Sequence, residues 1–201
     1  MPRDLGAAAL DHPIREKAMS RTPALNLEDM SPPQRAVYDA IVAGPRGVVP
    51  GPLRVWLTSP DLAQKAQDLG AFCRYGTSLA PRLSELAILV TAVYWRAGYE
   101  WFVHAPEAGK AGLDVAVIGD LLAGRTPRFR QADEQAVYDF ARELLDNRVV
   151  SDVAHARAVA ALGDLGVVEL TGILGYYGLI SMTIKAFEIG VPTGAEEPFA
   201  D

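Results

Sequence analysis

Hydrophobic residues recur along most of the chain at intervals of three and four, the spacing that places side chains on one face of an α-helix. The strand-like segments Val48-Val49 and Val149-Val150 are too short to build a sheet. The pattern therefore predicts an all-α protein. Its expected helices cover residues 32–43, 60–75, 81–96, 99–111, 113–123, 131–146, 152–162 and 167–188.

Helix starts are marked by capping signals. Ser31 is followed by two prolines and stands three residues before Gln34, which is typical of a capping box with proline in the first turn. Ser59 and the proline after it repeat the signal. Between these two starts, glycines and prolines crowd residues 44–52, and we expect no regular structure there.

The same pattern predicts a single helical domain over residues 27–192. Residues 1–26 have weak periodicity and are expected to form a flexible arm, and residues 193–201 a loose acidic tail. The motif at 36–39, Ala-Val-Tyr-Asp, recurs at 136–139. Two pseudo-repeated helical halves and chance similarity in a chain rich in alanine and leucine are both compatible with this repeat.

Residues 167–184 are apolar over a length that could cross a membrane. The segment nevertheless contains Glu169 together with several glycine, serine and threonine residues. Such a composition is more typical of the central helix of a soluble bundle, where small residues allow close helix crossings, and we interpret it so.

Composition narrows the class of protein. The chain has 201 residues, of which 50% are hydrophobic and 22% charged, with a net charge of −6 and no basic cluster to attract nucleic acid. The single cysteine, Cys73, leaves no disulfide or CxxC motif and favours a cytoplasmic location. Charged residues spread through the first 20 positions argue against a signal peptide. Cys73 shares a helical stripe with Leu62, Ala66 and Leu69, which we expect to face the core.

Glu85 is the first candidate for chemistry, because it lies in a predicted helix that is apolar nearly all round and therefore buried. A buried carboxylate must be paired, hydrogen-bonded or protonated. The residues alone favour a structural role, such as an ion pair with Arg82. An acid or base with a raised pKa is the alternative.

Glu100 and His104 stand four residues apart, so on a helix their side chains can touch. A neighbouring carboxylate orients an imidazole and raises its pKa. Taken alone, such a pair is more often a solvated surface contact. With Glu85 the pair could also bind a metal, but no zinc motif such as HExxH supports that alternative.

Several aromatic and basic residues are weaker candidates for substrate contacts. Their side chains bracket the break near Gly98 or lie in the glycine-interrupted final helix, although aromatics at helical spacing are more often core residues. They are Trp95, Arg96, Tyr99, Trp101 and Tyr176.

Separate motifs, met in order along the chain, resemble the carboxymuconolactone decarboxylase and AhpD-like family. They are SPPQRAVYDAIVAGPRG, YGTSLAPR, RLSELAILV around Glu85, YEWFVHAPEAGKAGL from residue 99, and ELTGILGYYGLISMTIKAFEIGVP from residue 169. The likeness covers most of residues 25–192 and is greatest to the long-chain branch with a Glu-Trp-x-x-His motif. It implies an AhpD-like helical bundle that assembles as a homo-oligomer (dimer, trimer or hexamer), with sites close to subunit contacts.

In the AhpD branch a helix glutamate, a CxxC pair and a later histidine form a thiol peroxidase relay. The resemblance places Glu85 and His104 at the glutamate and histidine, but Ala97 and Glu100 occupy the cysteine positions. A thiol peroxidase needs one thiolate to attack the peroxide and a second thiol to resolve the product. The resemblance therefore favours the decarboxylase branch over a peroxidase.

The decarboxylase branch acts on a small unsaturated lactone that bears a carboxylate, in the breakdown of aromatic compounds, and needs no cofactor. We expect His104 to deliver the proton, Glu100 to orient it and Glu85 to act as a second acid, base or hydrogen-bonding group. Trp101 and Tyr99 would form walls of the site. A peroxidase-like oxidoreductase and a non-catalytic helical oligomer that binds a small molecule are the alternatives.

Overall fold

The computed structural model describes residue 21 and residues 26–199, and this part of the chain contains eight α-helices, one short 3-10 helix and no β-strand. The all-α prediction is thus confirmed, whereas the expected arm lies almost wholly outside the described residues. The elements are η1 (Leu27–Asp29), α1 (Pro32–Ala43), α2 (Gly51–Trp56), α3 (Pro60–Tyr75), α4 (Pro81–Trp95), α5 (Gly98–Lys110), α6 (Val115–Leu122), α7 (Ala132–Asn147) and α8 (Asp152–Phe187).

The helix starts follow the capping signals in the sequence. At the start of α1 the backbone N–H of Ser31 donates to Oε1 of Gln34 at 2.9 Å, as a capping box requires. The expected irregular structure over 44–52 is wrong at its end, because α2 begins at Gly51. Pro52 is compatible with this helix because the first turn needs no N–H from it.

The expected inward stripe of α3 is also partly wrong. Cys73 and Ala66 are buried, but Leu62 and Leu69 are 45% and 47% exposed. Ala63 and Gly70 are buried with the first two, so the inner face of α3 consists of small residues. Such a face lets α3 lie close to α8, and the larger leucines are turned outward.

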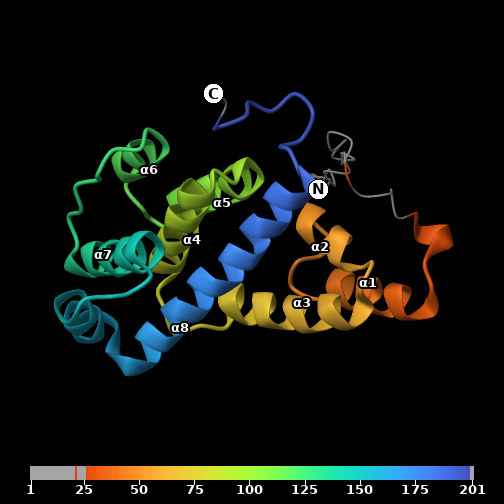
Figure 1. The fold of residues 1–201 in the computed structure, drawn as a ribbon, viewed down its shortest axis with the longest axis horizontal. Coiled ribbons are helices and arrows are strands. Elements are labelled where there is room, and N and C mark those ends of the chain that lie inside the picture. The colour runs from red at the N-terminus through yellow and green to blue at the C-terminus, as the bar shows by residue number, and fades with distance from the viewer. Residues whose placement is uncertain (1–20, 22–25, 200–201) are drawn as a thin grey trace, which may run out of the picture.

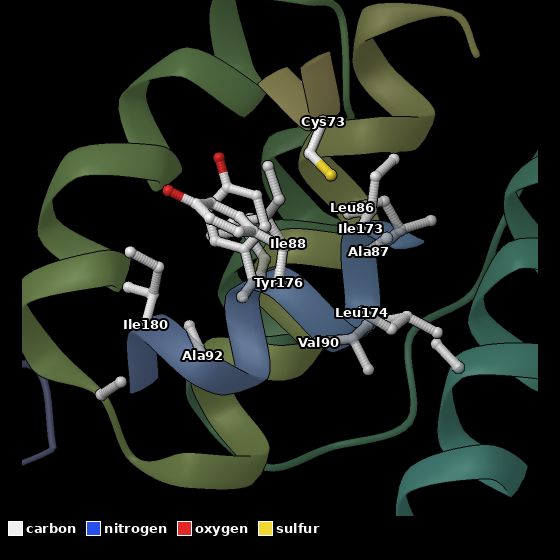
Figure 2. Close-up of a cluster of buried hydrophobic side chains, with 14 of the residues drawn as sticks. Cys73, Leu86, Ala87, Ile88, Val90, Ala92, Ile173, Leu174, Tyr176 and Ile180 are labelled. Atoms are coloured by element: carbon white, nitrogen blue, oxygen red, sulfur yellow. The ribbon is translucent and has the colours of Figure 1, made fainter. Parts of the chain in front are cut away.

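The core lies between α4 and α8, which cross near the middle of the molecule (Figure 1). Helix α4 is buried nearly all round, as its composition predicts. Figure 2 shows side chains from both helices meeting in this core, with Cys73 of α3 at its edge. The labelled members are Leu86, Ala87, Ile88, Val90, Ala92, Ile173, Leu174, Tyr176 and Ile180.

The two helices expected at 152–162 and 167–188 form one element, α8, with a kink at Gly163. Gly163 has φ 71°, a left-handed conformation that glycine adopts without strain. By length and composition α8 could cross a membrane. It packs against α2, α3, α4 and α7, and a third of its most apolar window is buried.

The chain after α8 returns to the start of α5. The Phe199 ring lies edge-on to Trp101 with 5.7 Å between centroids, and the Arg96 guanidinium donates to the Phe199 carbonyl oxygen at 2.7 Å. Residues 193–199 of the expected loose tail therefore make specific contacts with the end of α4 and with α5.

Candidate active site

A tight turn between α4 and α5 brings the candidate residues together. Helix α4 ends at Trp95, the next residue, Arg96, is left-handed with φ 49° and ψ 44°, and α5 begins at Gly98. The two helices pack against each other as a hairpin. Glu85 of α4 and His104 of α5, which are 19 residues apart, consequently lie side by side.

The His104 imidazole is held between two carboxylates. Its Nδ1 lies 2.8 Å from Oε2 of Glu85, and its Nε2 lies 3.2 Å from Oε2 of Glu100. The side chains of His104 and Glu100 are 3% and 8% exposed, and that of Glu85 is 12% exposed. The solvated surface pair that sequence alone would favour for Glu100 and His104 is therefore not what forms.

Burial and the two carboxylates act in opposite directions on the pKa of His104. Burial disfavours the charged imidazolium and lowers the pKa, but the hydrogen bonds to Glu100 and Glu85 and their negative charges outweigh it. The net effect raises the pKa of His104 from 6.5 to about 9. At neutral pH the imidazole is therefore protonated and donates from both ring nitrogens.

The ion pair with Arg82 that the sequence suggested for Glu85 does not form. The Arg82 guanidinium instead lies 2.6 Å from Oδ2 of Asp133 on α7. Glu85 is thus free to bind the imidazole. Its partner is His104 and not a residue in the first turn of α4.

A small cavity opens beside this histidine. Its volume is about 40 Å³, and its lining includes Glu100, His104, Tyr99 and Tyr176 but not Glu85. The two glutamates are therefore not equivalent: one contacts the cavity and the other supports the ring from behind.

Tyrosines surround the imidazole on the cavity side. The Tyr177 ring lies edge-on to His104 with 5.1 Å between centroids, and it packs in the same way on Tyr176 at 5.3 Å. The Tyr99 hydroxyl accepts a hydrogen bond from the backbone N–H of Gly51 at 3.3 Å, which ties α5 to α2. Burial raises the pKa of Tyr176 to about 12, so its hydroxyl stays neutral.

Three of the proposed substrate contacts lie elsewhere. Trp101 is buried against Phe199, and Arg96 lines a separate hollow with Lys185 near the end of α8. Trp95 packs edge-on against Tyr94 and does not line the cavity. Of the five residues, the structure brings only Tyr99 and Tyr176 to His104.

Sequence reasoning missed two arginines that line the cavity, Arg46 from the segment before α2 and Arg74 from the end of α3. Neither belongs to a motif with chemical meaning, and their placement depends on how α2 and α3 pack against α8. The turn-rich segment holding Arg46 and the amphipathic helix α3 gave no local signal of a site.

Cys73 does not share the chemistry of this site. Its side chain is 1% exposed in the core, and it does not line the cavity. Burial raises the pKa of its thiol to about 11, more than the nearby positive charge of Arg46 lowers it. The thiol is therefore protonated at neutral pH and is a poor nucleophile.

The geometry also bears on metal binding. Within residue 21 and residues 26–199, no group of three or more His, Cys, Asp or Glu side chains is arranged to hold a metal ion. Glu85 and Glu100 bind opposite nitrogens of one imidazole, so their carboxylates do not converge with a free ring nitrogen on one point.

A solved structure shares this all-helical fold. One matching solved structure is an uncharacterized peroxidase-related protein from Silicibacter sp. TM1040, with a TM-score of 0.69 and 11% sequence identity. The match covers 85% of this chain and 90% of that one. No protein-family model and no curated protein matches the chain. At this identity the likeness establishes the shared all-helical fold.

Proposed function

We propose that the chain is a cofactor-independent lyase that removes CO2 from a small carboxylated unsaturated lactone or a related acid. One observation carries the proposal: a buried, protonated imidazole lies between two carboxylates, and one of these carboxylates faces a cavity. A proton held in a water-poor site is what such a reaction needs, because the carbanion formed when CO2 leaves must be protonated.

The reaction balances without any other reactant. The bond between the carboxylate carbon and the ring breaks, and its electron pair moves into the conjugated lactone carbonyl. CO2 leaves, and the carbon that carries the negative charge takes one proton from the pair formed by His104 and Glu100. A proton from solvent then restores the imidazolium.

The positions of the two glutamates support different roles for them. Glu100 faces the cavity and accepts from Nε2 of His104, so the proton reaches the substrate along the His104–Glu100 contact. Glu85 binds Nδ1 and does not line the cavity, so it orients the ring and stabilises its charge. This division reverses the roles first expected of the glutamates.

The cavity of about 40 Å³ holds a few atoms and is smaller than a lactone ring with its substituents. The rest of the substrate must therefore lie at the mouth, or in space that opens when it binds. We also propose that the protein forms a homo-oligomer, as its resemblance implies, and that it works in the cytoplasm, which stays a prediction from the single cysteine.

Two alternatives have less support. A thiol peroxidase would depend on Cys73 alone, whose thiol is buried and protonated and does not contact His104 or Glu85 through any hydrogen bond. A protein that only binds a small molecule would use the same cavity, but it would have no need of an imidazolium between two carboxylates.

A paired assay tests the proposal. Purified protein is offered a panel of carboxylated unsaturated lactones and related acids, with turnover followed by ultraviolet absorbance, and peroxide with a dithiol donor in parallel. We expect loss of lactone absorbance and no peroxide consumption. Peroxide consumption without lactone turnover would support the oxidoreductase, and binding without turnover would support the non-catalytic protein.

The His104→Gln variant tests the assigned proton donor. It should reduce turnover by about 10²-fold or more if His104 acts as a general acid. His155→Gln is the matched control, because His155 lies exposed near the start of α8. Equal turnover in wild type and His104→Gln would remove the assignment.

A further inference from the structure

Two arginines that line the His104 cavity have no ion-pair partner in the described part of the chain. Arg46 and Arg74 both contact this cavity, yet no carboxylate among residues 26–199 forms an ion pair with either of them. Glu107, an acidic residue near Arg74, is paired with Lys110 at 2.8 Å instead. A guanidinium held beside a cavity with no anion of its own has the capacity to bind one from outside.

Arg46 is held in place by a specific arrangement. Its Nη2 lies 3.5 Å from the Tyr176 hydroxyl, and its Nε is buried with no hydrogen-bond partner in the described part of the chain. Gly70 of α3 makes room for both groups, because a Cβ there would overlap the Tyr176 hydroxyl and lie 2.6 Å from Nη2 of Arg46. A buried N–H without a partner is costly, and a bound anion would satisfy it.

The charges around the cavity set which end of a ligand goes where. The two carboxylates of Glu85 and Glu100 offset two of the three cations formed by His104, Arg46 and Arg74, which leaves one uncompensated positive charge. An entering anion is repelled by the carboxylate of Glu100, which lines the cavity, and attracted by the guanidinium groups. It therefore settles on the arginine side, with its neighbouring atoms towards Glu100.

We propose that Arg46 and Arg74 bind a carboxylate of the substrate and thereby place the adjacent carbon against Glu100 and His104. This inference names the residues that select an anionic substrate, and it rests in part on the proposed function. The planar carboxylate suits guanidinium donors, and a carboxylate with its first attached carbon is within the size of the cavity.

Binding of 2-furoate, an unsaturated five-membered ring with one carboxylate, tests the proposal by calorimetry. Its uncharged partner is methyl 2-furoate, and inorganic phosphate shows whether any anion suffices. We expect wild-type protein to bind 2-furoate at least about tenfold more tightly than the ester or phosphate. Equal affinity for acid and ester, or no binding of 2-furoate up to its solubility limit, would overturn the proposal.

Arginine variants connect the binding to these residues. Arg46→Met and Arg74→Met should each weaken the binding of 2-furoate at least about tenfold and leave the affinity for the ester unchanged. Arg46→Lys should recover part of the lost affinity. Arg54→Met is the control, because Arg54 is exposed on α2 and does not line the cavity. Circular dichroism checks that both methionine variants are folded. Unchanged 2-furoate affinity in both folded variants would refute the assignment.

The outcomes separate this inference from the proposed function. Arginine-dependent binding of 2-furoate without turnover of any lactone would leave the carboxylate site standing and the lyase proposal wrong. Lactone turnover with an unchanged KM in Arg46→Met and Arg74→Met would leave the lyase standing and this inference wrong. If both hold, KM for the substrate should rise more than kcat falls in the two variants.

Discussion

Glu85 and His104 come from different helices and meet with 2.8 Å between Oε2 and Nδ1. This contact forms because the left-handed residue Arg96 follows α4 and α5 folds back along that helix. The same contact, together with Glu100, keeps the imidazole protonated at neutral pH. A histidine in this state holds a proton at neutral pH and has no free ring nitrogen to accept another, which is why we assign an acid role to it.

The Glu85→Gln variant should lower the pKa of His104 below about 9, because it removes a negative charge and a charge-assisted hydrogen bond from Nδ1. Titration of the His104 ring by NMR measures this shift. Glu143→Gln on α7 is the control, since Glu143 accepts hydrogen bonds from Ser151 and is not among the groups that shift the His104 pKa. An unchanged titration of His104 in Glu85→Gln would show that Glu85 does not support the imidazolium.

The raised pKa of His104 predicts how stability depends on pH. The folded protein binds the His104 proton up to about pH 9, whereas the unfolded chain releases it near pH 6.5. The stabilising effect is therefore complete below pH 6.5 and lost as pH rises towards 9. At about 1.4 kcal/mol per pH unit, the loss is of the order of 3 kcal/mol.

Urea unfolding across that range measures the effect, and the His104→Gln variant should lack this part of the pH dependence. The comparison isolates His104, because other titrating groups are common to both proteins. A wild-type free energy of unfolding that rises with pH relative to the variant would contradict the predicted loss of stability.

Cys73 should be inert in the folded protein. Its side chain is 1% exposed and burial raises the pKa of its thiol to about 11, so little thiolate exists at pH 8 and a reagent has little access to it. We expect a disulfide reagent to label Cys73 only after denaturation. Rapid labelling or oxidation by peroxide under native conditions would reopen the peroxidase alternative.

Helix α8 offers a surface for the proposed homo-oligomer. Leu165, Val168 and Met182 lie exposed on its outer side, and Val168 is 71% exposed. Gly175 lies on the same side, with open space beyond it. The most apolar 18-residue window of α8 has a mean hydropathy of 1.6, yet only 33% of it is buried. A second copy of this uncharged stripe is the partner that suits it best, since two identical apolar faces can cover each other.

Light scattering in detergent-free buffer tests this assembly. Wild-type protein should be oligomeric, and Val168→Glu should shift it towards the monomer, because a charge in an apolar interface is costly. Val115→Glu is the control, since Val115 is 78% exposed on α6, away from α8. A monomeric wild type, or an oligomer unaffected by Val168→Glu, would show that α8 is not the interface.

The sequence predicts the helices well where local signals decide the structure. The capping box at Ser31 and the helix break near Gly98 depend on a few neighbouring residues, so both can be predicted from the chain, although the left-handed conformation of Arg96 was not. The inward face of α3 could not be predicted, because Leu62 and Leu69 fit a helical stripe as well as the small residues do. Only the packing of α3 on α8 selects between the two faces.

The residues of the candidate site likewise include some that local sequence predicts and some that it does not. Glu85, Glu100 and His104 lie on two helices that are consecutive in the chain, so their proximity follows from one short turn. Arg46 and Arg74 reach the cavity from segments that are distant in sequence from His104, and their positions depend on tertiary contacts. Trp101 was expected as a wall of the site, but its ring packs against Phe199 of the C-terminal segment, a contact between residues far apart in the sequence.

Gly70 provides a final test, because it links the packing of α3 to the proposed carboxylate site. Gly70→Ala places a methyl group where the Tyr176 hydroxyl and Nη2 of Arg46 lie, so one or both must move. We expect a loss of about 1–3 kcal/mol of stability, as in other overpacked sites, and weaker 2-furoate binding. Gly119→Ala is the control: Gly119 lies in α6 with open space around it, so alanine should stabilise that helix by up to about 1 kcal/mol. Equal stabilisation of both variants would mean that Tyr176 and Arg46 are not packed against α3, and the arrangement inferred for the anion site would then be wrong.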